Sequence, residues 1–167
     1  AEGTAAPGRL AIRGGSAGGW TSGASLTSTD VYRCGVIFYP VLDLTVFGPE
    51  GTHDFEAHYM HTLIGPLPEC AERYHKRSPV SHADRLTAPF LLLQGLDDVV
   101  CPPVQAERFV AGAQGRGIPH AYLTFEGEGH GFRKLTTLVT ALQAELSLYG
   151  QVFGFDPPDV PKLHLTT

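Results

Sequence analysis

The stretch Leu10-Ala11-Ile12-Arg13-Gly14-Gly15-Ser16-Ala17-Gly18-Gly19-Trp20 decides the fold. Its apolar start predicts a short strand over residues 9–13, and the small residues from Ser16 to about Leu26 predict a helix. A serine with glycines two positions before and after it, between a strand and a helix, is typical of a nucleophile elbow. Roughly 0.1 such matches are expected by chance in this composition, so the context is needed to interpret the pattern.

The glycines of this stretch have predicted steric roles. The serine of an elbow has a strained backbone, and side chains at Gly14 and Gly18 would collide there. Gly19 is expected to let the helix approach the strand closely. The alternative is an ordinary turn or a flexible Gly/Ser linker, but Trp20 and a long apolar segment follow, which argues against low complexity.

Length and composition limit the possible classes of protein. The 167 residues predict one domain, and 43% hydrophobic residues can form a core. The net charge of −5 argues against nucleic acid as a partner. No apolar run approaches the ~20 residues of a membrane span, so no membrane contact is expected. Residues 1–8 do not resemble a signal peptide, and the missing initiator Met suggests that residues precede Ala1.

The cysteines Cys34, Cys70 and Cys101 are odd in number and form no Cys-x-x-Cys pair. This spacing fits neither a zinc site nor a complete disulfide set. We therefore expect packing roles for all three, in a reducing compartment such as the cytoplasm.

Strands and helices alternate along the rest of the chain. Apolar runs predict buried strands over residues 35–39, 89–94 and 120–125, as in a parallel sheet. Helices are expected over residues 69–77, from Pro102-Pro103 onward, and over 135–149. The alternation predicts an α/β fold with right-handed crossovers. Residues 53–85 interrupt it and form the expected substrate-side excursion.

Helical periodicity marks one apolar face on each of three predicted helices. In a helix capped by Thr52 this face carries Phe55, Tyr59 and Leu63. In the helix that begins at Pro102-Pro103 it carries Ala106, Phe109, Val110 and Ala113. In the last helix it is a stripe of Leu135, Leu138, Val139, Leu142, Leu146 and Tyr149. The proline-rich tail beyond Gly150 is expected to fray.

Three chemically important residues follow predicted strands. Ser16, Asp98 and His130 each lie in a turn at a strand's carboxyl end, where ligands of parallel sheets bind. A serine hydroxyl needs a base to take its proton, and the base needs an acid to orient it. Histidine suits the base because its ordinary pKa, about 6.5, lies near neutral pH. The order Ser, Asp, His is that of α/β-hydrolases.

Each member of this set has an alternative reading. Asp98 could form a turn or cap a helix, Asp97 competes with it as the acid, and His130 could be a surface histidine. The order of the three residues and their positions at strand ends favour a catalytic triad.

Two other groups of residues point to different chemistry. His53, His58 and His61 lack a convincing further ligand, so no metal or cofactor is expected. Glu126 and Glu128 could be a carboxylate pair for glycoside chemistry, but are more simply turn residues.

The chain resembles the catalytic domain of the prolyl oligopeptidase family of serine peptidases, especially its acylaminoacyl-peptidase-like and dipeptidyl-peptidase-like members. The resemblance rests on residues 13–20, on 92–102 (Leu-Leu-Gln-Gly-Leu-Asp-Asp-Val-Val-Cys-Pro) and on 125–133 (Phe-Glu-Gly-Glu-Gly-His-Gly-Phe-Arg). It implies an α/β-hydrolase fold, a nucleophilic Ser16, an acidic Asp98, a basic His130, and an oxyanion-binding backbone N–H at Ala17.

The chain also departs from that family. The strands before the elbow, the loop that supplies a second oxyanion donor and the N-terminal β-propeller are missing, so residues 1–167 look like the C-terminal portion of a catalytic domain. The loop 41–45 lacks a diagnostic aromatic pattern, which leaves a preference for proline open.

Three functions are consistent with these residues. The first is a serine peptidase that acts on short peptides. The alternatives are a carboxylesterase or other acyl hydrolase with the same triad, and an inactive truncated module. An incomplete sheet would also leave an edge prone to homo-oligomer formation.

Overall fold

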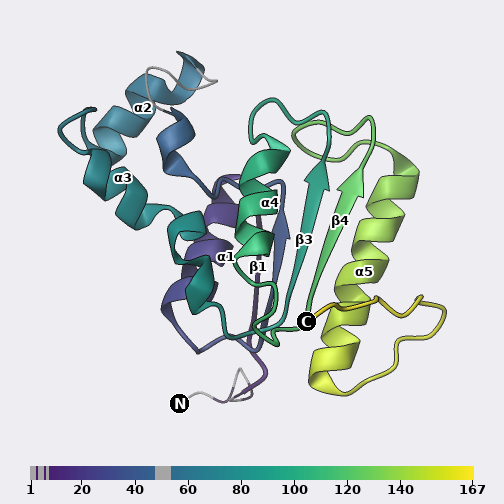
Figure 1. The fold of residues 1–167 in the computed structure, drawn as a ribbon. Helices are drawn as coiled ribbons and strands as arrows, with labels where there is room; N and C mark the ends of the chain where they lie inside the picture. The colour runs from purple at the N-terminus through teal and green to yellow at the C-terminus, as the bar shows by residue number, and fades with distance from the viewer. Residues whose placement is uncertain (1–2, 4–5, 7, 48–53) are drawn as a thin grey trace.

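The computed structural model describes residues 3, 6, 8–47 and 54–167. Within them, parallel strands form one sheet in the order β1-β2-β3-β4 (Figure 1). The strands are β1 (Ala11–Gly15), β2 (Cys34–Phe38), β3 (Phe90–Gly95) and β4 (His120–Phe125). β1 begins and ends two residues later than predicted, because Gly14 and Gly15 still pair with the end of β2. The predicted parallel α/β architecture is confirmed.

Helices cover both faces of this sheet. They are α1 (Ala17–Ser28), α2 (Asp54–Ile64), α3 (Ala71–Arg77), α4 (Pro103–Ala111) and α5 (Leu135–Phe153), with 3-10 segments at η1 (Leu44–Phe47) and η2 (Pro79–Arg85). α1 and α4 pack on one face and α5 on the other (Figure 1). α2 and α3 lie beyond α1, near the carboxyl ends of the strands.

The two central strands send alternate side chains into two cores. Phe90 and Leu92 of β3 pack under α4, whereas Leu91 and Leu93 pack under α5. Both strands are buried throughout, as continuous apolar runs predict. The predicted core face of α4 is confirmed, since all four of its residues are buried.

The helix predicted from the leucine stripe is confirmed as α5, but the stripe is not the face that packs on the sheet. Small residues and one leucine pack on the sheet: Ala141, Ala144 and Leu148. The predicted leucines lie on another face, where Leu135 and Leu142 are 75% and 62% exposed. Alanines let the helix axis lie close to the strands, so burial here follows the fit of small side chains.

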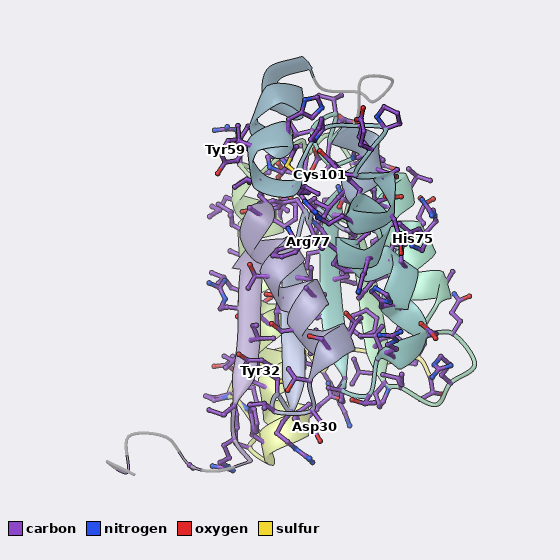
Figure 2. The ribbon with its side chains drawn as sticks, turned by 90° about the vertical axis from the view of Figure 1, so that its left-hand side faces the viewer. Asp30, Tyr32, Tyr59, His75, Arg77 and Cys101 are labelled. Atoms are coloured by element: carbon purple, nitrogen blue, oxygen red, sulfur yellow. The ribbon has the colours of Figure 1, made fainter. Side chains whose placement is uncertain are left out.

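The residues that mark the apolar face of α2 in the sequence are likewise not the ones that α2 buries. Tyr59 and Leu63 are exposed, and Figure 2 shows Tyr59 on the outside of the molecule. Met60 and Ile64 are buried instead, in a third core with Leu44 of η1 and Tyr74 of α3. This third core holds the excursion together. Thr52 lies outside the described residues, and so does the side chain of Phe55.

The tail does not fray. The backbones of His120 and Thr166 exchange two hydrogen bonds of 2.8 Å, and Ser147 Oγ accepts a hydrogen bond from the Leu163 backbone N–H. Leu163 and Leu165 pack against the core beneath α5. The tail therefore closes that core beside β4.

The three cysteines form no disulfide; Cys34 and Cys101 are buried and Cys70 is partly exposed. Burial raises the pKa of Cys34 to about 11, which keeps that thiol protonated and unreactive. Among the described residues, no helix has the length and apolar character needed to cross a membrane.

Candidate active site

Ser16 lies at the junction of β1 and α1 with a left-handed φ of 56°. Its N–H donates to the carbonyl of Phe38, and its carbonyl accepts from the N–H groups of Trp20 and Val41. A non-glycine residue in this region is strained, and here backbone bonds to β2 and α1 hold it. This is the strained turn that the sequence predicts for a nucleophile elbow.

The elbow glycines differ in what they allow. A Cβ on Gly14 would overlap the carbonyl of Gly18, so Gly14 is required for steric reasons. A Cβ on Gly18 would meet no atom within 4 Å, so the predicted collision at Gly18 is wrong. The close approach predicted for Gly19 is confirmed, because a Cβ there would lie 2.7 Å from Cβ of Pro40.

Alanine is therefore expected to have different effects at Gly14 and at Gly18. Gly14→Ala should lower kcat by about 10²-fold or more, because displacing the Gly18 backbone moves Ser16. It should also destabilise the fold by about 1–3 kcal/mol. Gly18→Ala should have little effect on either quantity. Steady-state kinetics and urea unfolding of both variants check this, and equal losses in the two would contradict it.

The three predicted residues meet at the carboxyl edge of the sheet. Nε2 of His130 lies 2.8 Å from Oγ of Ser16, and its Nδ1 lies 3.0 Å from Oδ2 of Asp98. A carboxylate only accepts hydrogen bonds, so Nδ1 carries the proton and Nε2 accepts from the serine hydroxyl. The Asp98 side chain is fully buried and that of His130 is 24% exposed. The site can move a proton from Ser16 and remains open to a substrate.

Asp98 is held by donors from its own turn. The backbone N–H groups of Val100 and Cys101 donate to Oδ1 at 2.9 and 2.7 Å. Nε2 of the buried Gln94 donates to Oδ2 at 3.3 Å. Asp97 is exposed, whereas Asp98 is buried. The geometry favours Asp98 over Asp97 as the partner of His130.

The sequence analysis assigned no role to Gln94. Its position as a polar residue at the end of the otherwise apolar β3 is the signal that could have pointed to such a role. Its side-chain amide also donates to the carbonyls of Gly95 and Cys101. It therefore fixes the start and the end of the Asp98 turn.

Glu128 organises the turn that carries His130. Its two carboxylate oxygens accept from the N–H groups of Arg133 and Lys134, each at 2.9 Å. Its own carbonyl accepts from the N–H of Asp97, which ties the turn of Asp98 to the turn of His130. The turn role predicted for Glu128 is thus confirmed.

The Glu128 carboxylate makes stability depend on pH. Desolvation raises its pKa, but the hydrogen bonds from the backbone N–H groups of Arg133 and Lys134 outweigh this, so the pKa is lowered from 4.5. A lowered folded-state pKa means that this stabilisation is present above the unfolded value and lost as the pH falls below about 4.5. The urea midpoint should fall less between pH 6 and pH 3 in Glu128→Gln than in the wild type. An identical fall in both proteins would contradict this role.

The N–H predicted to bind the oxyanion, that of Ala17, lies at the start of α1. Ala17 is the first residue of α1, and the first N–H groups of a helix have no acceptor within it.

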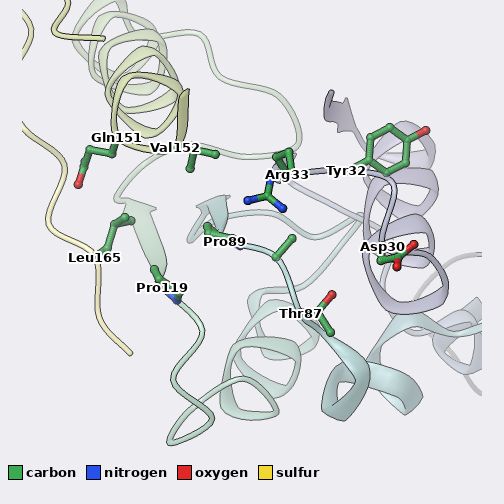
Figure 3. Close-up of a pocket in the computed structure, with 10 residues that line it drawn as sticks. Asp30, Tyr32, Arg33, Thr87, Pro89, Pro119, Gln151, Val152 and Leu165 are labelled. Carbon is green, nitrogen blue, oxygen red and sulfur yellow. The ribbon is translucent and has the colours of Figure 1, made fainter. Parts of the chain in front are cut away.

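A cavity of about 250 Å³ lies behind the elbow, between Gly15, Tyr39, Phe132 and α5. A larger cavity of about 520 Å³ lies at the opposite edge, lined by Arg33, Pro119 and Gln151 among others (Figure 3). It is remote from Ser16, so size alone does not identify the site.

The three histidines singled out in the excursion are only partly described. His53 and the side chain of His58 lie outside the described residues, and His61 is on α2. Within the described part of the chain, no group of three or more His, Cys, Asp or Glu could hold a metal ion.

Comparison with known proteins places this geometry in a family. Residues 1–156 match the prolyl oligopeptidase family. The structure of a puromycin hydrolase is 60% identical with a TM-score of 0.95, over 99% of this chain and 25% of that one. A puromycin-hydrolyzing peptidase of Mycobacterium tuberculosis is 54% identical with a TM-score of 0.93, over the same shares.

A curated relative supports the same assignment. Dipeptidyl peptidase family member 6 of Caenorhabditis elegans is 32% identical over 139 residues, which is 80% of this chain and 19% of that protein. The chain thus spans about a fifth to a quarter of the proteins that it matches. The predicted α/β-hydrolase fold is confirmed for the strands and helices present. The chain belongs to the prolyl oligopeptidase family of serine peptidases.

Proposed function

We propose that Ser16, His130 and Asp98 are the catalytic triad of a serine peptidase. The observation that carries this proposal is the unbroken hydrogen-bond chain from Ser16 through His130 to Asp98 at a strained elbow. The assignment of this chain to a peptidase family supports it.

In the proposed reaction, Oγ of Ser16 attacks the substrate carbonyl while Nε2 of His130 takes its proton. The N–H of Ala17 donates to the oxygen that becomes negative. His130 then protonates the leaving amine as the carbon–nitrogen bond breaks, which leaves an acyl-enzyme on Ser16. Water, deprotonated by His130, attacks the acyl-enzyme, and the proton returns to Ser16. Asp98 holds the imidazole and stabilises its charged form throughout.

The substrates proposed are short peptides and aminoacyl amides. Two relatives at 60% and 54% identity are named for puromycin hydrolysis, and puromycin contains an aminoacyl amide bond. We propose that this chain shares that activity, as the C-terminal portion of the catalytic domain of a longer protein. The cysteines, which form no disulfide, favour a cytoplasmic location.

The test measures turnover by the full-length protein. Peptide nitroanilides, puromycin and p-nitrophenyl esters are compared for the wild type and Ser16→Ala. Ser16-dependent hydrolysis of the amides supports the peptidase, whereas hydrolysis of esters alone supports the carboxylesterase. No Ser16-dependent turnover of either class supports the inactive module.

A further inference from the structure

A second strained residue lies at the end of β2, next to the elbow. Tyr39 has a φ of 31°, and the non-glycine residues with positive φ among those described are Ser16, Tyr39 and Asp159. For a bulky side chain such a φ is an outlier. Strain of this kind persists only where the surroundings impose it, and it clusters at active sites.

The surroundings of Tyr39 include the base of the triad. Its ring meets that of His130 nearly edge-on, with centroids 5.3 Å apart and an interplanar angle of 70°. On another side it meets the ring of Phe132 at 5.2 Å and 85°. The tyrosine ring therefore lies in contact with both Phe132, which packs against the core beneath α5, and the imidazole of His130.

The elbow leaves room for this ring. Gly15 lies in a strand with an ordinary φ, so its conformation does not require glycine. A Cβ on Gly15, however, would lie 2.9–3.0 Å from the Tyr39 ring. The next residue, Pro40, packs on Gly19, and the N–H of Val41 donates to the carbonyl of Ser16. Residues 38–41 thus pack closely against the elbow at Gly15 and Gly19. Neither of these glycines belongs to the Gly-x-Ser-x-Gly pattern.

We propose that Tyr39 is a positioning residue that holds the His130 imidazole between Ser16 and Asp98. The ring acts through His130, and the proposal rests on the triad function proposed above. Because small displacements of a base cost about 10²-fold in rate, losing the ring should lower kcat by about that factor with KM nearly unchanged.

The test uses Tyr39→Gly in the full-length protein, since glycine adopts the positive φ without strain. The expected result is the 10²-fold fall in kcat and an equally slower fluorophosphonate labelling of Ser16. Tyr39→Phe keeps the ring and should therefore retain most of the wild-type kcat. Phe153→Ala is the matched control, because it removes a half-buried ring that packs against the same core and does not contact the triad.

A double-mutant cycle sharpens the test. Gly15→Ala should lower kcat in the wild type by displacing the ring, and should cost nothing further in the Tyr39→Gly background. Additive losses, a wild-type kcat for Tyr39→Gly, or an equal loss in Phe153→Ala would overturn the positioning role. A wild-type protein that fluorophosphonate does not label at Ser16 would overturn the proposed function itself, and this inference with it.

Discussion

Replacing His130 with alanine is expected to lower kcat by on the order of 10⁶-fold. The imidazole is the group within hydrogen-bonding distance of both Ser16 Oγ and the Asp98 carboxylate, so its loss removes the path of the proton. Members of a triad act as a unit, so adding Ser16→Ala to this variant should cost almost nothing more. Single-turnover kinetics with an activated amide measures both effects.

The control for this variant is another histidine. His164 lies exposed on the tail, remote in the chain from the catalytic turns. His164→Ala should retain the wild-type kcat. An unchanged kcat in His130→Ala, or a strictly additive further loss on removing Ser16, would contradict the assignment of His130 as base.

Asp98→Asn is expected to lower kcat by about 10⁴-fold, with little change in the fold. The amide oxygen can still accept from the N–H groups of Val100 and Cys101, so the turn should survive. The amide nitrogen would then face Nδ1 of His130 and favour the wrong tautomer. Nε2 would carry the proton and could no longer accept one from Ser16.

Asp97→Asn is the matched control for this change. Its side chain is exposed, and its backbone N–H bond to Glu128 does not depend on the carboxylate. The variant should keep most of the wild-type kcat. A larger loss in Asp97→Asn than in Asp98→Asn would show that the acid of the triad has been misassigned.

The meeting of Ser16, Asp98 and His130 could be predicted from the sequence because each residue carries a local signal. Ser16 has its glycines, and Asp98 and His130 follow predicted strands in constrained turns. In a parallel sheet the carboxyl ends of strands meet at one edge, which brings such turns together. Local pattern and sheet geometry were therefore enough to predict that these side chains lie in contact, as they do.

The packed faces of α2 and α5 could not be predicted in the same way. Periodicity shows which residues share a helix face, but it does not show which face meets the sheet. In α5 the close approach of the helix selects Ala141 and Ala144, and the leucine stripe is left exposed. Side-chain volume at the contact, which depends on distant strands, decided the outcome.

The residues around Ser16, Asp98 and His130 could not be identified from the sequence, because their contacts form only in the folded chain. The ring of Tyr39 contacts His130, which is far away in the chain. The bonds of Gln94 lie within residues 94–101, and they depend on how that turn folds back onto the end of β3. Gly15 looks dispensable until the ring of Tyr39 is placed against it. Such roles depend on tertiary contacts that no short sequence pattern contains.

Labelling by a fluorophosphonate probe tests the central claim most directly, since the probe forms a covalent bond only with an activated serine. In the full-length protein, we expect one equivalent of probe on Ser16, identified by mass spectrometry of the labelled peptide. Ser16→Ala should abolish this labelling, and Asp98→Asn should slow it. Labelling at another residue, or equal labelling of the wild type and Ser16→Ala, would contradict the assignment of Ser16 as the nucleophile.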